Sequence, residues 1–97
     1  LQYLMNLTFD PAKDAANVVK HGVSLALALQ LEWDDMLSWI DRRRDYGEVR
    51  MSGLAPLGDR LYFVAFVVRP SAQPTERRII SLRKANTREV RRYARNN

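Results

Sequence analysis

The feature that most constrains the fold is an unbroken apolar run at residues 61–68, bounded by Arg60 and Arg69. A membrane-spanning helix needs about 20 apolar residues, so this run is far too short to cross a bilayer. A continuous apolar stretch of this length is typical of a strand that is buried on both faces of a sheet. We therefore predict that residues 60–69 form a central strand.

Cysteine is absent from the 97 residues, and histidine occurs once. The absence of thiols excludes a disulfide scaffold, a thiolate zinc site and a cysteine nucleophile. With 46% apolar residues the chain can build one core, so we expect a single domain at residues 6–97 with residues 1–5 as an extension. No charged and then apolar leader opens the chain, which favours a cytoplasmic protein without a membrane anchor.

Charge is distributed unevenly along the chain. Residues 1–49 carry five basic and eight acidic side chains, whereas residues 50–97 carry eleven basic and three acidic ones, for a net charge of +5 in the whole chain. Thirteen of the cations are arginines, whose planar fork of N–H donors matches pairs of phosphate oxygens. The basic half therefore indicates a polyanionic partner such as nucleic acid, with an acidic partner protein as the alternative.

Local signals predict helices and strands on both sides of the central strand. Asp10 with Pro11 starts a helix that Gly22 ends, Ser24 caps a second helix, and Asn86 with Glu89 forms a capping box for a third. The expected helices are residues 11–20, residues 25–32 and a segment from residue 87 on. The expected further strands are residues 7–9, 36–40, 48–54 and 76–83. This order favours an α+β domain with a single antiparallel sheet, two N-terminal helices and one C-terminal helix.

Alternation along two strands predicts a polar sheet face. Successive strand residues point to opposite faces, so Glu48, Arg50 and Ser52 share one side while Val49 and Met51 share the other. On residues 76–83 the same rule places Ser81 and Arg83 on the polar side and Ile80 and Leu82 in the core. A solvent-exposed face with cross-strand ion pairs is the alternative to a functional one.

Four ordered motifs resemble those of the BrnT toxin family. The first comprises FDPAK at residues 9–13, Asn17 and KHGVS at residues 20–24. The second is DRRRDYGEVR at residues 41–50, the third is the pair Arg60 and Arg69, and the fourth is RIISLRKA at residues 78–85 with Arg88, Glu89 and Tyr93. The likeness extends from Asn6 over nearly the whole chain.

This resemblance implies a ribonuclease toxin of a type II toxin–antitoxin module with a RelE-like or barnase-like α+β fold. The implied enzyme cuts RNA, inhibits translation and uses no metal cofactor. Its implied partner is a BrnA-like antitoxin, a ribbon-helix-helix protein, and promoter DNA is reached only through the antitoxin complex. The alternative from another functional class is a nucleic-acid-binding or co-repressor subunit without catalysis.

Metal-free RNA cleavage needs a base for the 2′-hydroxyl, an acid for the leaving 5′-oxygen and cations for the phosphorane. Glu48 is the candidate base, although it could simply pair with Arg50. His21 is the candidate acid, because the end of the first helix should raise its pKa, although a histidine there could merely cap the helix.

The candidate phosphate ligands are arginines and lysines of the basic half. Arg50, Arg83 and Lys84 are expected to bind the scissile phosphate, and we expect them to converge with Glu48 and His21 around one concavity. Further RNA contacts are expected from Lys20, Arg60, Arg69 and Arg88. Trp33 and Trp39 could stack on bases, although a chain this small should place at least one of them in its core.

Overall fold

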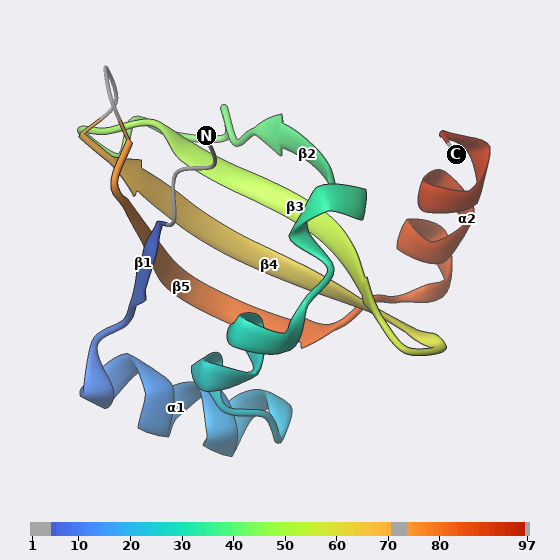
Figure 1. Ribbon diagram of the computed structural model, residues 1–97, viewed down its shortest axis with the longest axis horizontal. Helices are drawn as coiled ribbons and strands as arrows, with labels where there is room; N and C mark the ends of the chain where they lie inside the picture. The colour runs from blue at the N-terminus through green and yellow to red at the C-terminus, as the bar shows by residue number, and fades with distance from the viewer. Residues whose placement is uncertain (1–4, 71–73, 97) are drawn as a thin grey trace.

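A five-stranded mixed sheet forms the centre of the molecule in the computed structural model, which describes residues 5–70 and 74–96. The elements in chain order are β1 (Asn6–Thr8), α1 (Pro11–His21), η1 (Leu25–Gln30), η2 (Trp33–Asp35), β2 (Leu37–Ile40), β3 (Arg50–Leu57), β4 (Arg60–Arg69), β5 (Glu76–Lys84) and α2 (Thr87–Arg95), where η marks a 3₁₀-helix. The strand order is β1-β5-β4-β3-β2, so the predicted central position of β4 is confirmed. Figure 1 shows α1 beside β5 and the two 3₁₀-helices that follow it on the near face of the sheet. The helix α2 lies apart from them at one end of the sheet.

The predicted all-antiparallel sheet is wrong, because β1 pairs with β5 in parallel. Thr8 lies opposite Arg78, and α1 then places Asn17 against Leu82 further along β5. The segment from β1 to α1 thus follows β5 in the direction of that strand, which makes the pairing parallel. The other neighbouring strands are antiparallel, and the α+β class is as predicted.

The second N-terminal helix is a 3₁₀-helix and not the α-helix predicted for residues 25–32. Leu25 and Ala28 are its buried side chains, and Leu31, which directly follows its last residue, is buried as well. This spacing of three matches the three residues per turn of a 3₁₀-helix, which therefore presents all three side chains to the sheet. Ser24 caps the segment as predicted, because its hydroxyl accepts a hydrogen bond from the backbone N–H of Ala26.

The core lies between η1 and one face of the sheet. It contains Leu25, Ala28 and Leu31 together with Ala55, Tyr62, Val64, Phe66, Ile79 and Leu82 from β3, β4 and β5. Trp33 packs against this cluster and meets Phe66 edge-on at 5.2 Å between ring centroids. One tryptophan thus borders the core, as expected.

Both α-helices have the predicted caps. Asp10 accepts from the N–H of Ala12, and Gly22 ends α1 at a φ of 75°, a conformation that glycine adopts without strain. Asn86 and Glu89 form the capping box of α2. Helical spacing predicts that Val90, Tyr93 and Ala94 of α2 face the sheet, which is wrong for Val90 and Ala94, because both are exposed.

Both ends of β3 differ from the predicted ones, because hydrogen bonds to the neighbouring strands decide where this strand begins and ends. β3 begins at Arg50 and leaves Glu48 in the preceding loop, and it continues past the predicted end at residue 54 to Leu57. Residues 1–4 of the expected extension at residues 1–5 lie outside the described residues, as do residues 71–73 between β4 and β5.

Candidate functional site

The sheet face opposite η1 carries small residues in its middle and arginines around them. Strand register places Arg50, Val67 and Arg78 in one row, and Ser52, Ala65 and Ser81 in the next. Arg83 follows opposite Phe63. Directly opposed residues of antiparallel strands share a face, so we call the side chains of Arg50, Ser52, Ala65, Val67, Arg78, Ser81 and Arg83 the arginine face.

A β-bulge at Ile80 brings Arg78 to this face. Ser81 lies opposite Ala65 and Ile79 opposite Phe66, so Ile80 is the extra residue of β5. Strict alternation would place Arg78 and Leu82 on the same side, but the bulge reverses the alternation below it. The expectation that Ile80 fills the core is therefore wrong, because Ile79 occupies that place and is fully buried.

Val49 is also not in the core as expected, since it precedes β3 and is 48% exposed. Met51, its expected partner on that side, does pack against the core. The difference follows from the late start of β3, because a residue outside the paired strand is not held over the sheet.

Three arginines near this face lie over aromatic rings. The guanidinium carbon is 4.6 Å from the ring centroid of Tyr46 for Arg50 and 4.3 Å from that of Phe63 for Arg83. Arg92 of α2 lies over Trp39 at 3.9 Å. Such cation–π contacts fix the plane of each guanidinium. The Nε atom of Arg50 is buried without a hydrogen-bond partner, and a buried polar group without a partner is costly until a ligand or water satisfies it.

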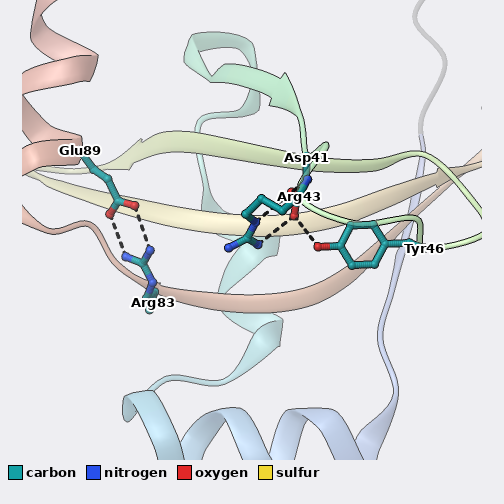
Figure 2. Close-up of polar contacts among 5 residues, drawn as sticks. All are labelled: Asp41, Arg43, Tyr46, Arg83 and Glu89. Atoms are coloured by element: carbon teal, nitrogen blue, oxygen red, sulfur yellow. Dashed lines mark hydrogen bonds and ion pairs between the residues drawn. The ribbon is translucent and has the colours of Figure 1, made fainter.

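Arg83 is held by a carboxylate of α2 (Figure 2). Its Nη1 and Nη2 atoms donate to Oε1 and Oε2 of Glu89 at 2.8 and 2.9 Å. The same carboxylate accepts from the backbone N–H of Asn86 in the capping box. The hydrogen bonds from Arg83 lower the pKa of Glu89, so this carboxylate is charged at neutral pH.

A second arginine–carboxylate pair lies at the end of β2. Arg43 donates from Nε and Nη2 to the two oxygens of Asp41, each at 2.9 Å, and the hydroxyl of Tyr46 donates to Asp41 Oδ2 at 2.9 Å. These bonds hold the pKa of Asp41 far below its ordinary value. In Figure 2 the Arg43 guanidinium extends over the strands in the direction of the Arg83–Glu89 pair. Both pairs line one hollow of about 460 Å³.

His21 ends α1 beside β5, and its electrostatics differ from the expectation. Burial, the charge of Lys20 and the charge of Arg83 lower the pKa of His21 below its ordinary value of 6.5. The helix end was expected to raise this pKa, but two nearby cations and partial desolvation outweigh the helix dipole. His21 is therefore mainly neutral at pH 7, a state that suits a proton acceptor better than the expected proton donor.

Glu48 pairs with Arg69 and not with Arg50. Arg69 donates from Nε and Nη2 to the two Glu48 oxygens at 3.0 and 2.7 Å, and these bonds lower the pKa of Glu48. Glu48 and Arg50 nevertheless line the same shallow hollow beside the loop at residues 41–47.

Lys84 leaves β5 on the side opposite to Arg83, because it lies across from Tyr62 of the core face. It lines a separate hollow of about 330 Å³ together with Arg60 and Asp59. Lys20 and Arg88 are exposed on α1 and α2. The expected convergence of five residues is thus wrong in detail: the structure joins Arg50 with Arg83, places His21 within the electrostatic range of Arg83, and keeps Lys84 on another side.

Sequence reasoning assigned no role in the site to Arg78 or to the two carboxylates that orient arginines, Asp41 and Glu89. Glu89 was recognisable as a capping residue, but its bond to Arg83 crosses from helix to strand. Arg78 was hidden by the bulge. The repeated proximity of arginine and aromatic residues, as in the segment Tyr46–Arg50, was the signal that could have indicated the cation–π contacts.

The model of the BrnT family, the ribonuclease toxin of type II toxin–antitoxin systems, matches residues 9–89 of this chain. The chain belongs to the BrnT family. It is accordingly a ribonuclease toxin, an enzyme that acts on RNA and has an antitoxin partner. The matched region contains the whole arginine face and Glu89. A search of curated proteins gives no match.

Within residues 5–70 and 74–96, no three His, Asp or Glu side chains gather as a metal site would require. In the same part of the chain, no helix is long and apolar enough to cross a membrane.

Proposed function

We propose that this BrnT toxin is a cytoplasmic endoribonuclease that cleaves RNA without a metal ion, with the scissile phosphate bound on the arginine face. The observation that carries the proposal is Arg50, whose buried Nε lacks a partner while its guanidinium is held over Tyr46. An oriented N–H donor that lacks an acceptor can donate to a phosphate oxygen, because guanidinium donors match the geometry of phosphate.

Arg78 and Arg83 supply further positive charge on the same face. Arg78 forms a long ion pair of 3.8 Å with Glu76 and donates to the Thr8 hydroxyl at 3.4 Å, and these long contacts leave its charge available to RNA. Arg83 is oriented by Glu89, and a phosphate would compete with that carboxylate for the same fork. Three cations around one phosphate stabilise the additional charge of the phosphorane, which is the usual task of a metal in other nucleases.

Proton transfer is assigned to two residues at the margins of the face. His21, with its lowered pKa, is proposed to accept the 2′-hydroxyl proton as a neutral imidazole. Glu48 is the alternative base, because it lines one hollow with Arg50. The arginines stabilise the charge of the leaving 5′-oxygen, which takes its proton from water. The RNA backbone away from the reacting phosphate is proposed to bind five further cations, which are Lys20, Arg60, Arg69, Lys84 and Arg88.

The antitoxin is proposed to be a BrnA-like ribbon-helix-helix protein that mediates any contact with promoter DNA. Apolar side chains available to a partner include Val19, 89% exposed on α1, and Leu29, 69% exposed on η1. Both lie on elements at one side of the sheet, so a partner seated there would also be close to His21.

Cleavage of a single-stranded RNA by purified wild type, Arg50→Ala, Arg50→Lys and Arg95→Ala, each with and without EDTA, tests the proposal. Arg50→Ala is expected to lose about 10²–10³ in rate, the usual cost of removing one donor to a developing charge. Arg50→Lys should recover only part of the rate, because an ammonium lacks the fork. Arg95→Ala removes an exposed charge at the end of α2 and should keep the rate within about twofold.

Unchanged cleavage by Arg50→Ala, with circular dichroism showing intact folding of all variants, would contradict the site. Loss of wild-type cleavage in EDTA would contradict metal independence. Binding of RNA by the wild type without any cleavage would support the alternative of a non-catalytic nucleic-acid-binding subunit.

A further inference from the structure

A hollow beside the arginine face offers a second kind of RNA contact. It is lined by Trp39, Asp41, Arg43, Phe63, Arg83 and Glu89 among others, and its volume is about 460 Å³. This size accommodates a nucleotide-sized group, since small-molecule sites begin at about 300 Å³. Such a contact rests on the proposed function, because it requires RNA to lie on the arginine face.

Trp39 provides an aromatic wall in this hollow. Arg92 covers its ring at 3.9 Å, and Phe63 lies 6.4 Å away between centroids with the ring planes tilted by 52°. Arg83 lies over the Phe63 ring at 4.3 Å, whereas Trp39 is partly exposed and lines the hollow. The part of the Trp39 ring that Arg92 does not cover is therefore available to a planar group. Stacking on an aromatic side chain is the common way in which proteins bind an unpaired RNA base.

Arg43 provides directional donors at the same hollow. It uses Nε and Nη2 for Asp41, which leaves the far end of the guanidinium, with N–H bonds on Nη1 and Nη2, directed away from the carboxylate. Its side chain is 76% exposed, whereas that of Asp41 is 3% exposed and is held by Tyr46 as well. Arg43 is thus accessible to a ligand, while the buried carboxylate of Asp41 holds its guanidinium in one orientation.

The charge of this pair distinguishes Arg43 from Arg50, the arginine proposed to bind the scissile phosphate. Asp41 neutralises Arg43, whereas Arg50 has no hydrogen bond from Nε to any acceptor. A neutral pair attracts a phosphate less than a free cation does, but its two parallel N–H bonds still match two adjacent neutral acceptors. Guanine presents such a pair in O6 and N7, while adenine presents one acceptor and one donor there.

We propose that this hollow binds a guanine base of the RNA strand, stacked on Trp39 and recognised through O6 and N7 by Arg43. The neighbouring phosphate then falls on Arg50, because Arg43 and Arg50 line a common hollow of about 290 Å³ together with Tyr46. Because Asp41 fixes its orientation, Arg43 gives the toxin a preference for guanine next to the scissile bond.

Binding of 2′-O-methyl pentanucleotides tests this proposal independently of cleavage, because they lack the attacking hydroxyl. The probes are penta-uridine and the same strand with a central guanine, adenine or 7-deazaguanine, measured by fluorescence anisotropy. Wild type is expected to bind the guanine strand about tenfold more tightly than the adenine strand, in line with one bidentate contact. The 7-deazaguanine strand, which lacks N7, should lose most of this gain.

Variants of single residues show which side chain causes the preference for guanine. Arg43→Lys keeps a cation beside Asp41 but lacks the fork, so it is expected to bind guanine and adenine strands alike while binding penta-uridine within about threefold of wild type. Trp39→Ala should weaken every strand that carries a purine. Arg44→Ala removes an equal, exposed charge from the same loop outside this hollow, and it is expected to weaken all strands equally and to keep the guanine preference.

Equal wild-type binding of guanine and adenine strands would overturn the proposal, and so would a guanine preference that survives in Arg43→Lys. In both cases, unchanged binding of penta-uridine would show that RNA still binds to the arginine face, so the proposed function would not be contradicted. Absence of binding to every strand would instead contradict the proposed function and the guanine site together.

Discussion

Asn17 is the single residue that most directly joins the helical layer to the sheet. Its Nδ2 donates to the carbonyls of Leu82 and Val23 at 2.8 and 2.9 Å, and its Oδ1 accepts from the N–H of Leu82 at 3.2 Å. The buried amide therefore pairs with the free edge of β5 as a neighbouring strand would. By holding α1 there, it also sets the position of His21 relative to Arg83.

Asn17→Ala is expected to destabilise the protein, because it leaves the N–H and C=O of Leu82 buried without partners. Each such group costs about 1–3 kcal/mol of unfolding free energy. Urea unfolding followed by circular dichroism measures the loss, with Lys13→Ala on the exposed side of α1 as the control. Equal midpoints for the two variants would show that water replaces the amide without cost.

At the scale of elements, α2 is attached to the sheet by polar contacts. Arg83 binds Glu89, Arg92 lies over Trp39, and the hydroxyl of Tyr93 donates to the carbonyl of Asp35 at 2.6 Å. None of the α2 residues is buried. Polar contacts at a half-exposed interface are weak individually, so the helix depends on its cap and on these few bonds.

Glu89→Ala is expected to release α2, since it removes half of the capping box and the ion pair to Arg83 in one change. The cap alone is worth about 1 kcal/mol. Amide hydrogen exchange should become faster across α2 and stay unchanged in β4, while Arg91→Ala should alter neither. Undiminished protection of α2 in Glu89→Ala would mean that Arg92 and Tyr93 hold the helix without the cap.

At the scale of the whole molecule, the chain separates its charge in space as well as in sequence. The second half, with eleven basic and three acidic side chains, builds β3, β4, β5 and α2, and these elements carry the arginine face and its margin. The acidic first half supplies the covering segments α1, η1 and η2. A surface charged in this way attracts RNA over a distance of about a Debye length.

Expression of the wild-type chain alone is expected to slow bacterial growth, and co-expression of a cognate ribbon-helix-helix antitoxin should restore it. Arg50→Ala should be tolerated without antitoxin, because it retains the partner surface but loses the cation proposed to bind the scissile phosphate. Growth curves after induction, with immunoblots for equal protein levels, measure both effects. Normal growth with abundant wild-type protein would contradict a toxin that acts through this site.

The local elements were predictable because their signals lie within a few residues of each other. The Asp10 and Asn86 caps, the glycine that ends α1 and the strand at residues 60–69 all follow from short patterns and are as the structure has them. The arginines on both sides of β4 were also partly predictable, since alternation alone places Arg50 with Ser52 and Arg83 with Ser81 on the polar face.

The tertiary structure alone decided the pairings between distant segments. The bulge at Ile80, which turns Arg78 to the arginine face, arises from the register of β5 on β4. The choice of Arg69 as the partner of Glu48 likewise depends on where a loop meets the end of another strand. Such contacts join residues far apart in sequence, and their geometry is set by packing of the whole sheet, so no local pattern of residues specifies them.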